Sequence, residues 1–215
     1  MNPAAIVFDL DGVLVDSERA WDEVRQRLVT DRGREWPADA TTAMQGMSTP
    51  EWSAYLAGLV GDSPQELARQ VIAAMADRYR ERVPLLPGAV DAVRALAARW
   101  PLAVASSSPP DLIRVVLAAA GVSDRFRVTV SSEEVARGKP APDVYLAAAE
   151  RLGVDPAGCV AIEDSANGLR AAAAAGMTVV AVPNEHFPPP ADALALAKAQ
   201  VSTPAGLTPE LIGQL

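Results

Sequence analysis

Histidine and cysteine are almost missing from this chain, which has one of each among 215 residues. The single cysteine, Cys159, excludes an internal disulfide and stands in an apolar run that predicts a buried strand. The single histidine, His186, would have to carry any Ser-His-Asp or Cys-His mechanism alone, and no metal site can be built from several histidines. Because His186 lies among prolines in a loop-like segment, we expect it at the surface or at the rim of a site.

Long hydrophobic runs are also absent, and the N-terminus lacks a basic segment followed by an apolar one. We therefore expect a protein that neither crosses a membrane nor is exported, with a cytoplasmic location. The formal net charge of −8 argues against non-specific binding to nucleic acid or to anionic membrane surfaces. Half of the residues are hydrophobic, which is enough for a sizeable core, and we expect a monomer.

Lysine is the third scarce residue, with two copies, Lys139 and Lys198, against 17 arginines. Lys139 stands between Gly138 and Pro140, and proline stiffens the segment that carries it. A lone lysine is usually solvated. An ammonium group held in a rigid loop also suits a phosphate oxygen, so this residue needs a specific explanation.

Short apolar segments alternate with helical ones from residue 102 onward. The segments 102–106, 127–131, 159–162 and 178–182 predict strands, and the segments 109–120, 142–152 and 165–175 predict helices. Glycine follows each of these helices, as is favoured at helix ends. This alternation predicts an α/β protein with a parallel, doubly wound, Rossmann-like sheet, which an apolar strand at residues 5–8 would join.

The stretch between that first strand and the alternating region contains no convincing strand. It predicts three helices, at residues 17–29, 49–59 and 63–82, and Ser63-Pro64-Gln65-Glu66 is a capping sequence that opens the last one. We therefore predict an α/β core of residues 1–16 and 85–215 with an inserted all-helical cap of residues 17–84. Residues 188–215 are expected to close the core, although the patterns do not place them within it.

Polar residues follow four of the predicted strands: Asp9 and Asp11, then Ser106 and Ser107, then Lys139, then Glu163 and Asp164. Taken singly, each has an ordinary explanation, such as a turn at Asp11-Gly12 or a helix cap at Ser108. Because the carboxyl ends of parallel strands meet at one edge of a sheet, the four sets are expected to form one site. Adjacent carboxylates suit a hard cation such as Mg²⁺, and hydroxyls beside a helix N-terminus suit a phosphate.

Taken in order, these motifs resemble those of the haloacid dehalogenase-like hydrolase superfamily. The motifs are Asp9-Leu10-Asp11-Gly12-Val13, Ser106, Lys139-Pro140 and Glu163-Asp164-Ser165. The segments Asp-Gly-Val-Leu-Val-Asp-Ser, Gly-Lys-Pro-Ala-Pro-Asp and Glu-Asp-Ser-Ala-Asn-Gly are similar to its phosphatase and β-phosphoglucomutase-like branch. The helical insertion resembles the type 1 cap of that family. The resemblance covers nearly the whole chain but does not identify a substrate.

The resemblance implies a phosphatase that acts on a small phosphorylated metabolite, such as a sugar or polyol phosphate. It implies that Asp9 attacks phosphorus and forms an aspartyl-phosphate. Asp11 would protonate the leaving oxygen and then activate water. Ser106, Ser107 and Lys139 would hold the phosphoryl oxygens.

The resemblance also implies Mg²⁺ as the cofactor. The cation would bind the Asp9 carboxylate, the Asp11 main-chain carbonyl and Asp164, with Glu163 bound directly or through water. A metal-free dehalogenase is disfavoured, because Asp11 and Asp164 would have no role in that reaction.

A β-phosphoglucomutase-like mutase is the main alternative, because it needs the same core. In such mutases the cap supplies a His, a Lys and an Arg at positions that align here with Trp21, Gln45 and Thr49. Three contacts to a second phosphate are then lost, which favours a phosphatase. Three arginines of the predicted cap could restore a second phosphate site: Arg19, Arg25 and Arg27.

The residues of the cap expected near the substrate are Ser17, Trp21, Gln45, Gly46 and Thr49, with the loop around Gln45 setting specificity. A non-catalytic protein that binds a phosphorylated ligand is a further alternative. Its expected mark is loss of Asp9 or Asp11, and both are present.

Overall fold

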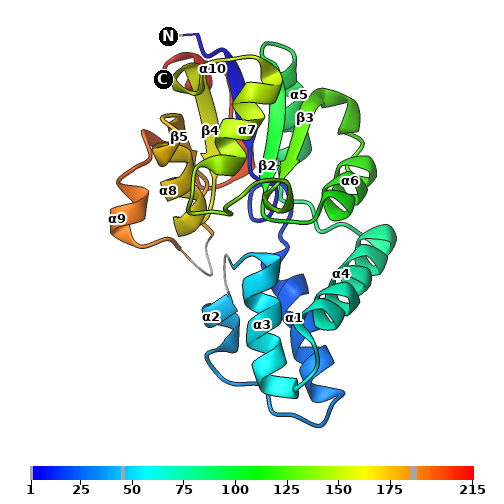
Figure 1. Cartoon of the computed structure of the whole chain (residues 1–215). Helices are drawn as coiled ribbons and strands as arrows, with labels where there is room; N and C mark the ends of the chain where they lie inside the picture. The colour runs from blue at the N-terminus through cyan, green and yellow to red at the C-terminus, as the bar shows by residue number, and fades with distance from the viewer. Residues whose placement is uncertain (1, 45–46, 185–187) are drawn as a thin grey trace.

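Six parallel strands form one sheet in the computed structural model, which describes residues 2–44, 47–184 and 188–215. The strand order is β3-β2-β1-β4-β5-β6, so the first strand of the chain lies inside the sheet (Figure 1). The strands are β1 (Ala5–Phe8), β2 (Leu102–Ser106), β3 (Phe126–Ser131), β4 (Cys159–Glu163), β5 (Thr178–Ala181) and β6 (Ala199–Gln200). The predicted α/β class with a parallel sheet is confirmed.

The helices fall into two groups. Between β1 and β2 lie α1 (Glu18–Thr30), α2 (Ala40–Met44), α3 (Thr49–Val60), α4 (Pro64–Glu81) and α5 (Ala89–Ala97). The others are α6 (Pro110–Ala119), α7 (Asp143–Leu152), α8 (Ala166–Ala174), α9 (Ala191–Leu194) and α10 (Pro209–Gly213). Within the described residues, no helix is both long enough and apolar enough to cross a membrane.

Helices α2, α5, α9 and α10 and strand β6 add to the predicted elements. Helix α5 does carry a helical pattern, since Ala89, Ala92, Val93 and Leu96 are buried at the spacing of one helix face. The prolines and the glycine just before it, at 84, 87 and 88, indicate only the end of the preceding helix. Strand β6 has two residues, too few for any periodicity to appear.

Both faces of the sheet are covered, as the alternation of side chains along β1 requires. Ile6 and Phe8 lie in one apolar cluster with α5, α6 and α10, whereas Ala5 and Val7 lie in a second cluster with α7, α8 and α9. Strands buried on both faces must be apolar throughout, which the sequence of β1 satisfies. Many residues of α7 and α8 in the second cluster are alanines, so these helices can approach the sheet closely.

Helices α1 to α4 gather beyond the carboxyl ends of the strands, opposite the two chain termini (Figure 1). Helices α1, α3 and α4 pack against one another there. Their positions agree with the three helices predicted for this stretch. Ser63 Oγ accepts a hydrogen bond from the backbone N–H of Glu66 at 3.2 Å, which confirms the predicted cap of α4.

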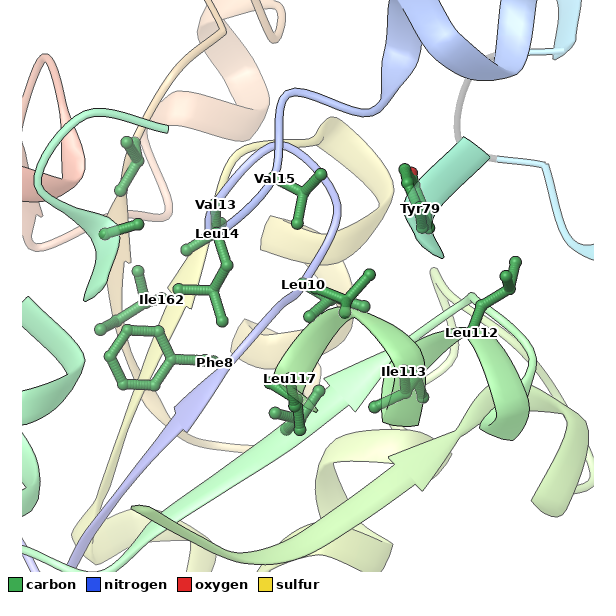
Figure 2. Close-up of a cluster of buried hydrophobic side chains, with 14 of the residues drawn as sticks. Phe8, Leu10, Val13, Leu14, Val15, Tyr79, Leu112, Ile113, Leu117 and Ile162 are labelled. Carbon is green, nitrogen blue, oxygen red and sulfur yellow. The ribbon is translucent and has the colours of Figure 1, made fainter. Parts of the chain in front are cut away.

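The loop after β1 joins this helical group to the sheet. Its apolar side chains are buried, and Figure 2 shows them in one cluster with residues of α6 and with Tyr79 of α4; they are Leu10, Val13, Leu14 and Val15. Where the chain enters and leaves the helical group, the Asp16 backbone N–H donates to the Pro84 carbonyl at 2.8 Å. The carboxyl end of β1 is therefore fixed by apolar packing on the side away from its polar residues.

Candidate active site

Three charged side chains meet at the carboxyl ends of β1 and β4. Lys139 Nζ donates to Asp9 Oδ1 and to Glu163 Oε1, each at 2.6 Å. Asp9 follows β1, Glu163 ends β4, and Lys139 comes from the loop before α7. All three side chains are buried. Because β1 and β4 are neighbours in the sheet, the fold brings together carboxylates that stand far apart in the sequence.

Three buried carboxylates in this cluster, Asp9, Glu163 and Asp164, face the single buried ammonium group of Lys139. Burial opposes the charge of Lys139, but Asp9 and then Glu163 outweigh it and raise the pKa of Lys139. Burial raises the pKa of Asp9 to about 8, against the opposing effect of Lys139 and with help from Glu163 and Asp11. Burial, followed by Glu163 and Asp9, also raises the pKa of Asp164. One ammonium group therefore does not balance these carboxylates, and a second cation would.

Glu163 is fully buried, and both of its oxygens accept hydrogen bonds. Oε1 accepts from Lys139 and from the Tyr145 hydroxyl, the latter at 2.7 Å. Oε2 accepts from the backbone N–H of Asp164 at 3.0 Å, and from the backbone N–H and the hydroxyl of Ser165, both at 3.1 Å. Glu163 is thus held as an acceptor that orients Lys139, and direct metal binding would have to displace some of these contacts.

Asp11 faces the serines that follow β2. Its Oδ2 accepts from Ser108 Oγ at 2.6 Å and from Ser106 Oγ at 3.3 Å. The prediction that Ser108 caps the next helix is wrong, because its hydroxyl is used by Asp11. Pro109 is the N-cap of α6 and Pro110 its first residue. Ser107 lines the pocket beside this pair.

The tight turn at Gly12 lets the Asp164 side chain lie directly against the loop that carries Asp11. Gly12 has a φ of +80°, and a Cβ built there would lie 1.9 Å from Asp164 Oδ2. Only glycine allows this approach in this backbone conformation. Asp9, Glu163 and Asp164 each offer a carboxylate oxygen, and these oxygens lie within 4.8 Å of one another. A buried group of oxygen donors with excess negative charge fits a Mg²⁺ ion.

The pocket above these carboxylates is lined from the other side by the helical group. Helix α1 contributes Glu18, Trp21 and Arg25, and helix α3 contributes Thr49 and Trp52. The ring centroids of Trp21 and Trp52 are 6.0 Å apart. The pocket therefore has an acidic floor from the strand ends and an aromatic wall from α1 and α3.

The structure places the predicted cap residues in different ways. Trp21 and Thr49 line the pocket. Ser17, the residue before α1, is fully buried and is not among the residues that line the pocket, so its contact with substrate stays a prediction. Gln45, Gly46 and His186 lie outside the described residues.

The side chains of the site that add to the predicted ones include Glu18, Trp52, Ser108 and Tyr145. Ser108 belongs to the run of three serines after β2, so a polar signal was present there. Tyr145 gives no such signal, because it follows Lys139 by six residues on a helix whose other buried residues are apolar or small. Its role depends on which face of α7 meets β4.

Comparisons with known proteins show which chains this one is similar to. A family model described as haloacid dehalogenase-like hydrolase matches residues 3–176. Hexitol phosphatase B from Escherichia coli K12 is 40% identical over 186 residues, which cover 83% of each chain. Fructose-1-phosphate phosphatase YqaB from the same strain is 34% identical, over 83% of this chain and 96% of that protein. The crystal structure of CbbY from Rhodobacter sphaeroides in complex with phosphate aligns with a TM-score of 0.87 and 26% identity, over 99% of this chain and 100% of the other.

Proposed function

Because the chain belongs to the haloacid dehalogenase-like hydrolase family, we propose that it is a Mg²⁺-dependent phosphatase of small phosphorylated metabolites. The observation that carries this proposal is the buried Asp9 carboxylate at the floor of a pocket, held by Lys139 and adjacent to Asp11. The names of the hexitol and fructose 1-phosphate phosphatases support a sugar or polyol phosphate as substrate.

Asp9 is the proposed nucleophile. A carboxylate oxygen of Asp9 forms a bond to phosphorus while the bond from phosphorus to the substrate oxygen breaks, which gives an aspartyl-phosphate. Asp11 donates a proton to the leaving oxygen. In the second step Asp11 takes a proton from water, the water oxygen attacks phosphorus, and Asp9 leaves as a carboxylate. General acid–base help of this kind is worth roughly 10²–10⁴-fold in rate.

The hydroxyls around Asp11 suit this exchange of roles. Ser108 and Ser106 donate to Asp11 Oδ2, which holds the carboxyl group in one orientation in both steps. Lys139 would offer its charge to the phosphoryl oxygens, and Ser107, which lines the pocket, would add hydroxyl or backbone donors beside the start of α6. Ser106 is fully buried outside the pocket lining and its hydroxyl donates to Asp11, so its predicted contact with the phosphate stays a prediction. Such fixed donors stabilise charge that develops in the transition state without reorganising.

Asp9, Asp164 and the main-chain carbonyl of Asp11 would hold Mg²⁺, with Glu163 acting through water or through Lys139. When bound, the cation supplies positive charge that offsets repulsion between the Asp9 carboxylate and an anionic phosphate. The excess of buried carboxylate at this position is the feature of the structure that supports this assignment.

We further propose that residues 17–84 act as a cap that opens to admit substrate and closes to exclude water, as lids do. The core would then be residues 1–16 and 85–215. A cytoplasmic monomer remains our expectation for the cellular form.

Phosphate release from Asp9→Asn tests the proposal most directly. The panel contains hexitol, ketose and aldose monophosphates, and β-glucose 1-phosphate with trace glucose 1,6-bisphosphate, each with Mg²⁺ and with a chelator. We predict Mg²⁺-dependent release by the wild type and a loss of at least about 10³-fold in Asp9→Asn, because the nucleophile is gone. Circular dichroism should show that the variant stays folded, because Glu163 still pairs with Lys139.

Asp111→Asn is the matched control, since the Asp111 side chain is 80% exposed and pairs with Arg114 on the surface of α6. It should retain wild-type turnover. Near-normal activity of Asp9→Asn would refute the assignment of the nucleophile. Glucose 6-phosphate formed without free phosphate would mean a mutase.

A further inference from the structure

Arg25 is the one buried cation that the proposed chemistry does not use, among the residues that the structure describes. It lies on α1, is 8% exposed and lines the pocket. Its guanidinium carbon lies 4.9 Å from the ring centroid of Trp21 and 4.9 Å from that of Trp52. Two indole rings therefore hold the planar group in one orientation.

The guanidinium of Arg25 makes no hydrogen bond within the described part of the chain, and its Nε is buried without a partner. Arg32, at the end of the same helix region, shows the ordinary arrangement. Its guanidinium donates to Asp62 at 2.7 Å, to the Leu28 carbonyl at 2.9 Å and to Gln70 at 2.8 Å. A buried guanidinium without acceptors is costly, so a ligand that supplies acceptors would be bound strongly.

The charges around Arg25 limit what that ligand is. Burial lowers the pKa of Arg25 to about 10, and three carboxylates oppose this shift: Glu18, Asp22 and Asp11. Four carboxylates line the pocket as a whole, Asp9, Asp11, Glu18 and Asp164, against the two cations Arg25 and Lys139. A second phosphate or carboxylate placed at Arg25 would meet this negative field, whereas a neutral hydroxyl would not.

Glu18 supplies the complementary acceptor. It lies on the same helix as Arg25, seven residues earlier, which places both residues on the same face of α1. It lines the pocket together with Arg25. A guanidinium that donates and a carboxylate that accepts, beside tryptophan rings, together match the alternating hydroxyl groups of a polyol chain.

We propose that Arg25, with Glu18, is the specificity-determining pair of this pocket, and that it binds hydroxyl groups of the substrate at the end remote from the phosphate. The inference rests on the proposed phosphatase function and deepens it. The pair selects an uncharged polyhydroxylated chain over a second anionic group. It thereby assigns a substrate role to one of the three arginines, since Arg19 and Arg27 have side chains that are 86% and 83% exposed.

The test compares two substrates in Arg25→Gln. A hexitol 6-phosphate presents a hydroxyl chain to the pair, whereas p-nitrophenyl phosphate presents none. We expect kcat/KM for the hexitol phosphate to fall about 10- to 100-fold more than kcat/KM for p-nitrophenyl phosphate, mostly through KM. Arg25→Lys, which keeps the charge but loses the planar fork, should fall between the wild type and Arg25→Gln.

Arg27→Gln is the matched control on the same helix and should leave both substrates unchanged. An equal loss on both substrates in Arg25→Gln, together with a lower thermal midpoint, would overturn the proposal in favour of a structural role. A selective loss on fructose 1,6-bisphosphate, with the hexitol phosphate unaffected, would overturn it in favour of an anion site.

Calorimetric binding of the hexitol phosphate separates this inference from the proposed function. If the wild type releases phosphate from no substrate, the phosphatase proposal fails. Binding at least tenfold weaker in Arg25→Gln would then still support Arg25 as a ligand contact. Equal binding by the two proteins, or none by either, would overturn it.

Discussion

Lys139 keeps its positive charge although its side chain is buried, and burial alone would disfavour the charged form. Its side chain is 4% exposed and lies 2.6 Å from a carboxylate oxygen of each of two acids, Asp9 and Glu163. Breaking such a buried pair by removing one partner typically costs about 3–5 kcal/mol, because the remaining charge is left without compensation. The residues that we assign to phosphoryl transfer therefore also hold one another in place.

Glu18 is a pocket residue whose ionisation opposes folding, and it lies in the helical group, apart from Asp9 and Asp164. Burial, and then the charge of Asp11, raises the pKa of Glu18 from 4.5 to about 6, with Arg25 opposing. The folded protein therefore binds this proton more tightly than the unfolded chain. The stabilisation that comes from binding this proton is fully present below pH 4.5, and it is lost as the pH rises through about 6.

We predict that Glu18→Gln has a more favourable effect on stability at pH 7.5 than at pH 4.5, by about 1 kcal/mol, because the neutral amide avoids the cost of the buried charge. The measurement is the free energy of urea unfolding of the wild type and the variant at the two pH values.

Glu23 on the same helix provides a control of opposite sign. Hydrogen bonds from Arg78 and Arg19 lower the pKa of Glu23, so its stabilising effect is present above its ordinary pKa and is lost as the pH falls. The effect of Glu23→Gln on the free energy of unfolding should therefore not become more favourable between pH 4.5 and pH 7.5. A similar change in both variants would contradict the prediction for Glu18.

At the scale of the elements, local patterns predict most helix and strand positions, and they also predict which strand ends meet. Asp9, Ser106, Lys139 and Asp164 converge because the strands are parallel, and that much follows from the alternation of strands and helices. Contacts made just before a helix or in its first turn do not follow from it. The hydrogen bond from Ser108 to Asp11 depends on the path of the loop before α6, and the one from Tyr145 to Glu163 depends on how α7 is rotated against the sheet.

The first turn of α8 also fits closely around Glu163. A Cβ at Gly168 would lie 1.7 Å from Glu163 Oε1, so an added methyl group must displace either the carboxylate or the helix. We predict that Gly168→Ala lowers kcat/KM by at least about tenfold and destabilises the protein by about 1–3 kcal/mol, because Glu163 would lose hydrogen bonds to Lys139 and Tyr145. Phosphate release and urea unfolding measure the two effects.

Gly58→Ala in α3 is the matched control. A Cβ at Gly58 meets no heavy atom within 4 Å, so alanine there should stabilise the helix by about 0.5–1 kcal/mol. It should not change activity. If Gly168→Ala behaved like Gly58→Ala, the assigned fit between α8 and Glu163 would be wrong.

At the scale of the whole molecule, the site lies where two layers of structure meet. The sheet supplies the acids and the lysine from its strand ends, and α1 and α3 supply the wall of the pocket. One apolar cluster runs without a break from Phe8 and Ile162 in the sheet to Trp52 and Met75 in the helical group. The apolar residues of this cluster therefore hold the sheet and the helical group, the two sides of the pocket, together.

This shared cluster predicts that the chain unfolds in one cooperative transition, since neither part can lose its fold without exposing apolar surface of the other. Three of the four tryptophans, Trp21, Trp36 and Trp52, lie in the helical group, so Trp100→Phe leaves fluorescence probes there alone. In urea, the fluorescence transition of this variant should coincide with its far-ultraviolet circular dichroism transition, which reports all helices and strands. A fluorescence midpoint at lower urea would mean that residues 17–84 unfold while the sheet persists. That result would make the proposed cap an independently folding unit, against the single cooperative transition expected from the shared cluster.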